Sequence, residues 1–198
     1  MSVLGSIDSP PAATVPLSRM LIRWIISFVG FPLGGLAAMT LVGPVDSLGS
    51  ALLGGLLTGL VLGTVQAWAL RLRRRPGAGW VVATSAGLAV GVVAGASTVG
   101  FATSLADLVW QGAISGAAVG AAQIVLLWHR IGWLSLAWPA LLAVAWAIGW
   151  TVTTTIGVAV DQQFTVFGSA GAVTVTVLTS ILPIMLRPRV ADSGTDAR

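Results

Sequence analysis

Few side chains in this sequence could carry catalytic or metal chemistry. The 198 residues contain one His, six Asp and no Cys, and Lys, Glu, Tyr and Asn do not occur. Without Cys, disulfides, thiol catalysis and thiolate metal sites are excluded. A hydrolytic triad needs a His beside a carboxylate, but His129 is expected on the opposite side of the membrane from Asp46, Asp107 and Asp161. We therefore expect a protein that is not an enzyme and that uses no metal or cofactor.

Two glutamines stand in unusual positions, deep in apolar stretches. Gln66 and Gln123 each lie seven residues before an arginine, Arg73 and Arg130. An amide in hydrocarbon is costly unless it is hydrogen-bonded, so both side chains should face protein. The same 57-residue offset leads on to Ser180. If the helices that carry these residues pack together at the centre, Gln66, Gln123 and Ser180 lie at one level. There they either join the helices by hydrogen bonds or bind water or a polar solute.

Glycines precede both glutamines at four-residue spacing. The two ridges are Gly55, Gly59 and Gly63, and Gly112, Gly116 and Gly120. On a helix of 3.6 residues per turn this spacing makes one slowly winding stripe. Small residues let helix backbones approach closely in lipid. The ridges predict helix packing within the chain, with homo-oligomerisation through an exposed ridge as the alternative.

The composition indicates that these residues belong to a membrane protein. Apolar residues make up 56% and charged residues 8% of the chain, whereas soluble domains carry about 25% charge. A transmembrane helix needs about 20 mainly apolar residues, and continuously apolar spans must be helical because lipid offers backbone groups no partner. The six predicted spans are Leu21–Val42, Leu48–Leu70, Gly79–Ala102, Leu108–Trp128, Leu134–Val160 and Phe164–Leu186.

Charged residues predict the orientation of these spans. Asp46, Asp107 and Asp161 occupy three connections that hold no arginine. The arginines at the other boundaries are Arg19, Arg23, Arg71, Arg73, Arg74, Arg75, Arg130, Arg187 and Arg189. The positive-inside rule makes the arginine side cytoplasmic, and with six spans both termini are then cytoplasmic.

The predicted transmembrane domain covers residues 19–189. Residues 1–18 and 190–198 are polar enough to predict disordered cytoplasmic tails. The first tail holds no Lys or Arg and is followed by a run of full span length, which argues against a signal peptide. The bias towards Arg, Ala, Gly and Val suggests a bacterial plasma-membrane protein.

An internal repeat organises the spans. At the 57-residue offset, Gly30 and Gly34 of the first span recur as Gly87 and Gly91 of the third. The second ridge, with its glutamine and arginine, maps onto Ser169, Val173, Val177, Ser180 and Arg187 in the sixth span. The predicted fold is an all-α polytopic membrane helix bundle. Its six transmembrane helices form three parallel helical hairpins of about 57 residues, related by an axis along the membrane normal.

The sequence also carries a resemblance to other proteins. The stretch Gln66-Ala67-Trp68-Ala69-Leu70-Arg71, followed by an arginine loop and Gly79-Trp80, resembles hairpin repeats of uncharacterised bacterial multi-pass membrane proteins. The second copy departs from this pattern: Gln123-Ile124-Val125-Leu126-Leu127-Trp128. The resemblance covers Gly55–Gly149. It implies a membrane protein without an established activity and adds no chemistry.

The interfacial residues have structural and functional interpretations. Each interspan aspartate precedes an even-numbered span, where it could cap a helix or, alternatively, attract cations to a pore mouth. Arg71, Arg73, Arg74 and Arg75 could hold anionic lipid headgroups, or act only as a topology signal. Most of the nine tryptophans lie near the predicted cytoplasmic boundary, as in an aromatic belt.

These observations favour a non-enzymatic integral membrane protein with a structural role or a role as a subunit of a membrane assembly. The alternative is a small permease or channel for a neutral or weakly polar solute. No charged residue falls in the centre of a predicted span, which argues against an ion-driven pump. The expected partners are the bilayer, including anionic lipids, and either further copies of the chain or other membrane proteins, but not nucleic acid.

Overall fold

A computed structural model describes residues 16–158 and 165–187 of the chain. Within these ranges the structure is helical and has no strand, which confirms the predicted all-α class. The elements are α1 (Leu17–Ile26), the 3-10 turn η1 (Ser27–Val29), α2 (Gly30–Leu41), α3 (Leu48–Ala69), α4 (Arg74–Thr98), α5 (Leu105–Ile131), the 3-10 segment η2 (Gly132–Ala137), α6 (Trp138–Thr155), α7 (Ser169–Leu178) and α8 (Ile181–Met185). Helix α1 begins inside the predicted tail 1–18, and the predicted tail 190–198 lies outside the described residues.

The helices are apolar enough to indicate a membrane protein. Four stretches are long and apolar enough to cross a membrane: Leu17–Leu41, Leu48–Ala69, Arg74–Thr98 and Leu105–Thr155. The last runs for 51 residues through α5, η2 and α6, and the apolar stretch Ser169–Met185 is shorter. Large apolar side chains remain exposed on successive helices, among them Leu33, Leu60, Val90 and Val125. Such surfaces suit contact with lipid rather than with water.

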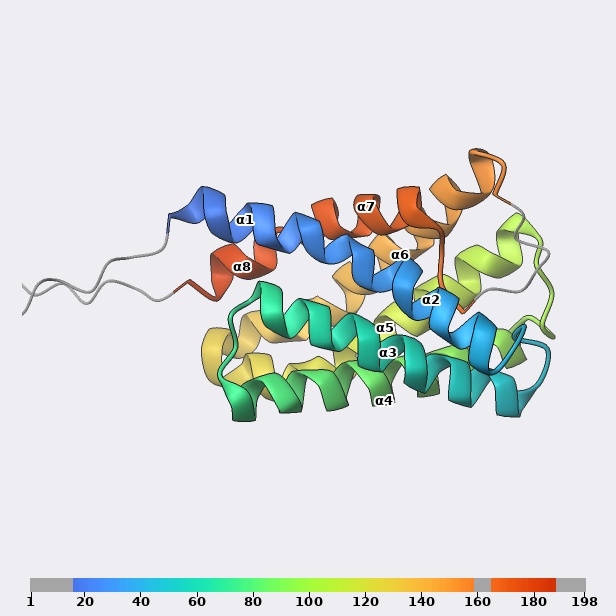
Figure 1. The fold of residues 1–198 in the computed structure, drawn as a ribbon, viewed down its shortest axis with the longest axis horizontal. Helices are drawn as coiled ribbons and strands as arrows, with labels where there is room; N and C mark the ends of the chain where they lie inside the picture. The colour runs from blue at the N-terminus through green and yellow to red at the C-terminus, as the bar shows by residue number, and fades with distance from the viewer. Residues whose placement is uncertain (1–15, 159–164, 188–198) are drawn as a thin grey trace, which may run out of the picture.

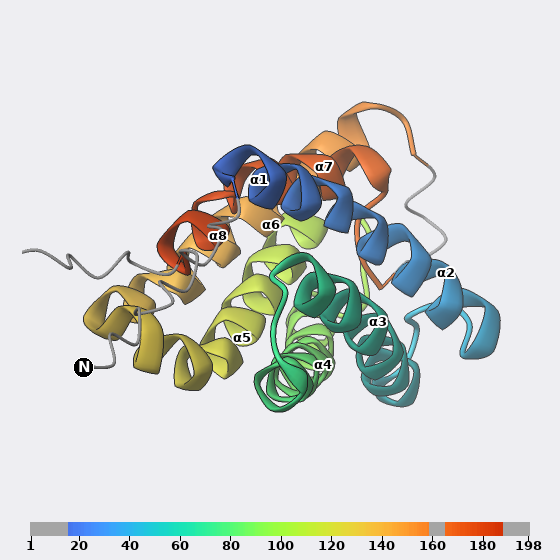
Figure 2. The ribbon, with the colours of Figure 1, turned by 60° about the vertical axis from the view of Figure 1, so that its left-hand side comes forward.

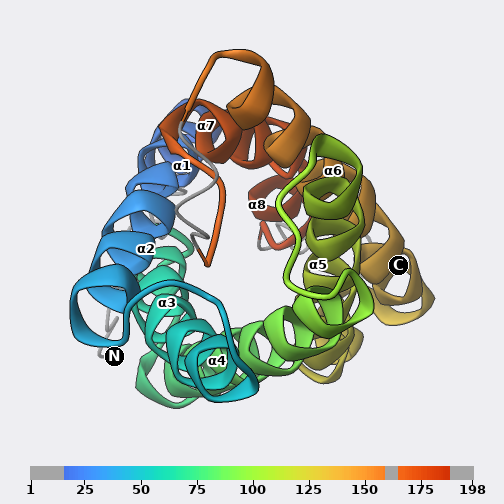
Figure 3. The same cartoon turned by 90° about the vertical axis from the view of Figure 1, so that its right-hand side faces the viewer.

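The helices form a closed ring in chain order. Figure 1 shows them running side by side, and Figure 2 shows the same bundle after a rotation of 60°. In the end-on view of Figure 3, α1–α2, α3, α4, α5, α6 and α7 follow one another around a central axis. The chain reverses in η2, so that α5 and α6 pack along each other. Helix α7 closes the ring by contacting α1, η1 and α2.

The two ends of the ring carry opposite charges. The start of α1, the α3–α4 and α5–α6 connections and the end of α8 lie together, on the left in Figure 1. This arginine end holds Arg19, Arg23, Arg71, Arg73, Arg74, Arg75, Arg130 and Arg187. The α2–α3 and α4–α5 connections lie at the other end, the aspartate end, with Asp46 and Asp107. Asp161 and Arg189 lie outside the described residues.

Glycines occupy the seams between successive helices of the ring. A Cβ on Gly55 would lie 2.7 Å from the Cα of Ala89, and one on Gly91 would lie 2.7 Å from the Cα of Ser115. The same close approach is made by Gly59 and Gly63 between α3 and α4, by Gly87 and Gly95 between α4 and α5, and by Gly112, Gly116 and Gly120 between α5 and α6. Both glycine ridges are therefore covered by neighbouring helices of the same chain.

Prolines account for the breaks in the first and last helices. Pro32 has no N–H for the carbonyl of Phe28 and its ring crowds that carbonyl, and the 3-10 turn η1 falls there. Pro183 acts in the same way on Thr179, between α7 and α8. The predicted sixth span, Phe164–Leu186, thus differs from the structure, in which the helix starts only at Ser169 and is interrupted after Leu178.

Candidate functional site

Gln123 joins three helices through its side-chain amide. Its Oε1 accepts a hydrogen bond of 2.7 Å from Nε1 of Trp138 on α6, and its Nε2 donates one of 2.9 Å to Oγ1 of Thr84 on α4. An indole N–H can only donate, so it fixes which end of the amide faces Trp138. Gln123 is only 1% exposed. The α5 amide is thus buried and satisfied at both ends.

Gln66 on α3 makes a similar contact with α4 but only half of the network. Its Oε1 accepts a hydrogen bond of 3.1 Å from Nε1 of Trp80 on α4. The indole again fixes the amide orientation, which turns the NH₂ group away from Trp80. Among the described residues this NH₂ group has no hydrogen-bond partner, and it is not fully buried. Gln66 therefore offers a free donor at the centre of the ring.

A third indole bonds a backbone carbonyl where Trp80 and Trp138 bond a glutamine. Nε1 of Trp24 on α1 donates a hydrogen bond of 3.0 Å to the carbonyl oxygen of Thr176 on α7. In an unbroken helix that carbonyl would accept from the amide of Ser180, but at the α7–α8 break the Ser180 amide bonds Val177 instead. The break therefore leaves the Thr176 carbonyl available to the indole.

Ser180 does not take the predicted place beside the two glutamines. It is half-buried and does not line the central cavity, whereas Thr176 and Thr179 do. The hydroxyl of Thr179 bonds back to the carbonyl of Val175 at 2.8 Å. The structure therefore brings Gln66 and Gln123 together with Thr176 and Thr179. The 57-residue offset predicts the wrong residue, Ser180, because the helix is interrupted just before it.

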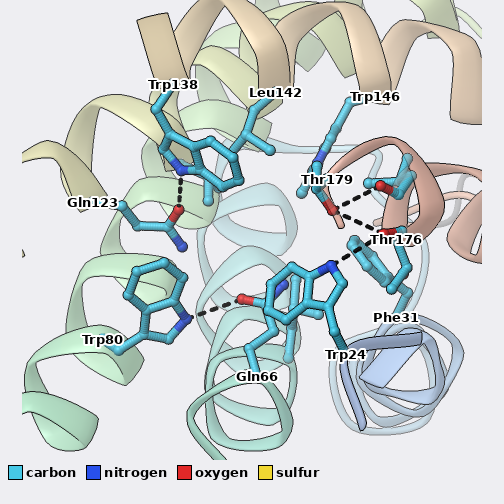
Figure 4. A pocket seen from close by; sticks show the side chains of 13 residues that line it. Trp24, Phe31, Gln66, Trp80, Gln123, Trp138, Leu142, Trp146, Thr176 and Thr179 are labelled. Carbon is cyan, nitrogen blue, oxygen red and sulfur yellow. Dashed lines mark hydrogen bonds between the residues drawn. The ribbon is translucent and has the colours of Figure 1, made fainter. Parts of the chain in front are cut away.

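These groups surround a small cavity on the axis of the ring, shown in Figure 4. Its polar lining comes from the two glutamines, Thr176, Thr179 and the three indoles. The apolar lining comes from Phe31, Leu62, Val119, Leu142, Trp146 and Val175. The volume is about 10 Å³, close to the minimum of about 10–15 Å³ that a single water molecule needs. In this conformation the cavity is thus large enough for little more than water.

An aromatic cluster lies next to the cavity and contains a residue that the sequence did not single out. The ring of Phe167 lies 4.9 Å from that of Phe31, 5.3 Å from that of Trp146 and 6.0 Å from that of Trp150, measured between ring centroids. Phe31 and Trp146 also line the cavity. Phe167 is only 1% exposed.

The arginine end carries charge that the described carboxylates do not neutralise. Arg71, Arg73, Arg74 and Arg75 are exposed in and after the α3–α4 connection, whereas Asp46 and Asp107 lie at the other end. Because the described carboxylates are remote, counter-charge for these four guanidinium groups has to come from outside the described residues.

Arg23 is held against the end of α3. Its guanidinium carbon lies 4.4 Å from the centre of the Trp68 ring, and its NH2 group donates a 2.8 Å hydrogen bond to the Trp68 carbonyl. A cation suits this place because a helix C-terminus carries partial negative charge. His129 and Arg130 occupy the corresponding last turn of α5.

The described aspartates lie at helix N-termini. Ser47 caps α3 in a reciprocal pair with Ser50, whose hydroxyl also donates to Asp46 at 3.2 Å. Ser104 caps α5 and pairs with Asp107 in its first turn. Negative charge is favourable at both places. The caps are therefore Ser47 and Ser104, and Asp46 and Asp107 accept hydrogen bonds from serine hydroxyls beside these helix N-termini. Asp161 lies outside the described residues.

No protein-family model matches this sequence, and no curated protein and no solved structure is significantly similar to it. The functional argument therefore rests on the residues and their geometry.

Proposed function

We propose that this chain is a non-enzymatic integral membrane protein of a bacterial plasma membrane, with six membrane-crossing segments in three parallel hairpins and with both termini in the cytoplasm. The reversal at η2, which lays α5 against α6, supports two crossings within Leu105–Thr155. The three indole contacts made by Trp24, Trp80 and Trp138 support the repeat. The concentration of described arginines at one end supports the orientation.

Of the two roles expected from the sequence, the geometry favours a small permease or channel for a neutral or weakly polar solute. The observation that carries this proposal is that Gln66 and Gln123 line a cavity on the axis of the ring. The polar groups there are amides, hydroxyls, indoles and carbonyls, which suit an uncharged solute with hydrogen-bonding groups. The free NH₂ group of Gln66 is the donor that such a solute would meet. Because the cavity is small, passage requires the ring to widen.

A structural or subunit role is the second candidate. The glycine ridges give it little support, because the chain's own helices cover them. A different surface favours it. The rings of Trp128 and Trp133 pack edge to face, with their centroids 5.0 Å apart, near the α5–α6 turn, where Trp133 is 77% and Leu134 is 64% exposed. This apolar surface suits a membrane partner, a second copy of the chain or the bilayer interface.

Anionic lipids are the proposed partners of Arg71, Arg73, Arg74 and Arg75. Basic residues near a membrane surface gain about 1 kcal/mol each from anionic lipid headgroups. The distance of the described aspartates from these arginines supports this proposal.

Solute flux tests the proposed function. Purified protein in liposomes should speed glycerol- or urea-driven volume changes, followed by stopped-flow light scattering, relative to protein-free liposomes. Gln66→Leu should slow the protein-dependent rate by about tenfold, because a lost hydrogen bond to a polar solute costs about 1–1.5 kcal/mol. Gln111→Leu is the matched control, since Gln111 is buried in α5 but does not line the cavity. Equal rates with and without protein, for both solutes, would reject permeation of this class of solute.

A further inference from the structure

The segment Thr165–Gly168, which leads into α7, lies inside the ring. In Figure 3 the segment extends from the start of α7 towards the central axis. Thr165, Val166 and Phe167 are 5%, 4% and 1% exposed. Connecting segments normally run over the surface, where water satisfies their backbone groups. A connection with three successive buried side chains is therefore held in the ring by specific packing.

Three glycines make room for this segment, each on a different helix. A Cβ on Gly54 of α3 would lie 3.0 Å from Oγ1 of Thr165, and one on Gly35 of α2 would lie 3.2 Å from Cγ2 of Val166. A Cβ on Gly149 of α6 would lie 3.2 Å from the Phe167 ring and 2.8 Å from Cγ2 of Val175 on α7, so Gly149 serves both the segment and the α6–α7 seam. A Cβ on Gly35 or Gly54 would meet no atom outside this segment closer than 3.8 Å. These two glycines therefore serve the inserted segment rather than helix packing.

The segment lies on the aspartate side of the cavity. Gly35 and Gly149 are each six residues before the last residue of their helices, and Gly54 is six residues after the first residue of α3. At 1.5 Å per residue, these positions lie about 9 Å inside the aspartate end. Phe31 and Trp146 separate Phe167 from the glutamines, since both contact its ring and also line the cavity.

The segment is also anchored at its end. The backbone N–H of Gly168 donates a hydrogen bond of 3.1 Å to Oγ1 of Thr153 near the end of α6. Thr153 is only 1% exposed. This hydrogen bond fixes the point at which the chain leaves the interior of the ring and enters α7.

We propose that Thr165–Gly168 is a plug that closes the aspartate end of the axial path, with Phe167 as the barrier residue. This inference rests on the proposed function, for which the cavity is part of a solute path. A buried apolar constriction excludes water and polar solutes because it offers them no hydrogen bonds. Val166 and Phe167 provide that constriction. Gly35, Gly54 and Gly149, which leave room for the segment, are called its sockets.

Cysteine labelling tests the plug without measuring transport. The chain contains no Cys, so an introduced cysteine is the only thiol. Leu142→Cys places it in the cavity lining, and a membrane-impermeant maleimide is applied to the face at which Ala102→Cys reacts. Adding Phe167→Ala should raise the labelling rate of Leu142→Cys by about tenfold or more, because labelling follows the population of the open state. Phe167→Leu, which keeps the path filled, should leave the rate near that of the parent.

A buried position that does not line the cavity separates unplugging from general loosening. Thr58 on α3 faces α2, is fully buried and does not line the cavity, so Thr58→Cys serves as the control. Its labelling should not change when Phe167→Ala is added. The plug is refuted if the rate at Leu142→Cys stays unchanged, or if Thr58→Cys accelerates equally.

Solute flux in the same vesicles distinguishes the two proposals. Faster labelling together with faster glycerol or urea flux supports both. Faster labelling of the cavity without any protein-dependent flux supports the plug and overturns the permease proposal. Protein-dependent flux with unchanged labelling overturns the plug and leaves the permease proposal standing.

Discussion

Gly59→Ala should destabilise the helix ring by about 3 kcal/mol, although it adds only one methyl group. The new Cβ would collide with the Cα of Ser85 and would lie 3.0 Å from both the Ser85 nitrogen and the Thr84 carbonyl oxygen. These are backbone atoms of α4, which cannot move aside as a flexible side chain can. Helices α3 and α4 would have to separate along their seam, with loss of the packing that holds helices together in lipid. Unfolding by sodium dodecyl sulfate in mixed micelles, followed by tryptophan fluorescence, measures the effect.

Gly49→Ala provides the matched control on the same helix. A Cβ at Gly49 would meet no atom within 4 Å. Alanine is a better helix former than glycine by about 0.5–1 kcal/mol, so this variant should be neutral or slightly more stable. If both variants unfold like the parent, then the α3–α4 seam does not have the close approach described above.

Gln123→Leu should cost about 2 kcal/mol, because it leaves buried polar groups without partners. Leucine cannot accept from the Trp138 indole or donate to the hydroxyl of Thr84, and both residues are at most 5% exposed. The same unfolding assay measures the loss. Gln111→Leu, again a buried glutamine on α5, should cost less because its side chain does not join α4 to α6 in this way.

A double variant tests the stated cause of that loss. Trp138→Phe removes the indole N–H that Gln123→Leu leaves unpaired, so the two changes together should cost clearly less than the sum of the single costs. Strictly additive costs would mean that the Gln123–Trp138 bond contributes nothing to stability. In that case the buried amide would need another explanation.

The helices could be predicted from the sequence because their signal is compositional. Continuous apolar runs in a chain with 8% charge leave helices as the structure expected in lipid, and the all-α class is confirmed. Helix α3 ends within one residue of its predicted boundary at Leu70. The last helix was harder to predict because hydropathy does not register a break. A single Pro183 barely lowers the mean hydropathy of the apolar run around it, yet it interrupts the backbone hydrogen bonds near Thr179.

The central site could be predicted only in part, for a physical reason. Gln66 and Gln123 stand out because an amide within an apolar run requires a partner. The third indole, that of Trp24, bonds the Thr176 carbonyl, a group that every residue has and that no sequence pattern marks. A usable signal was present in the tryptophans, because Trp24, Trp80 and Trp138 recur at nearly the repeat spacing.

The plug could not be predicted from the sequence either. Val166 and Phe167 are apolar like their surroundings, and hydropathy places the run that contains them in the predicted sixth span. Their position depends on sockets at Gly35, Gly54 and Gly149 that come from three distant helices. Such a contact is decided by tertiary packing rather than by local sequence.

The side of the membrane on which each connection lies tests the central claim most directly. Single cysteines can be placed at Ala102 and Ile156, at the two ends of the 51-residue apolar stretch, and at Leu134 in its turn. A membrane-impermeant maleimide added outside intact bacterial cells should label Ala102→Cys and Ile156→Cys, whereas Leu134→Cys should react only after the membrane is permeabilised. Labelling of Ala102→Cys and Ile156→Cys from opposite sides, or of Leu134→Cys from outside, would contradict the reversal of the chain between α5 and α6 and the orientation proposed for the arginine end.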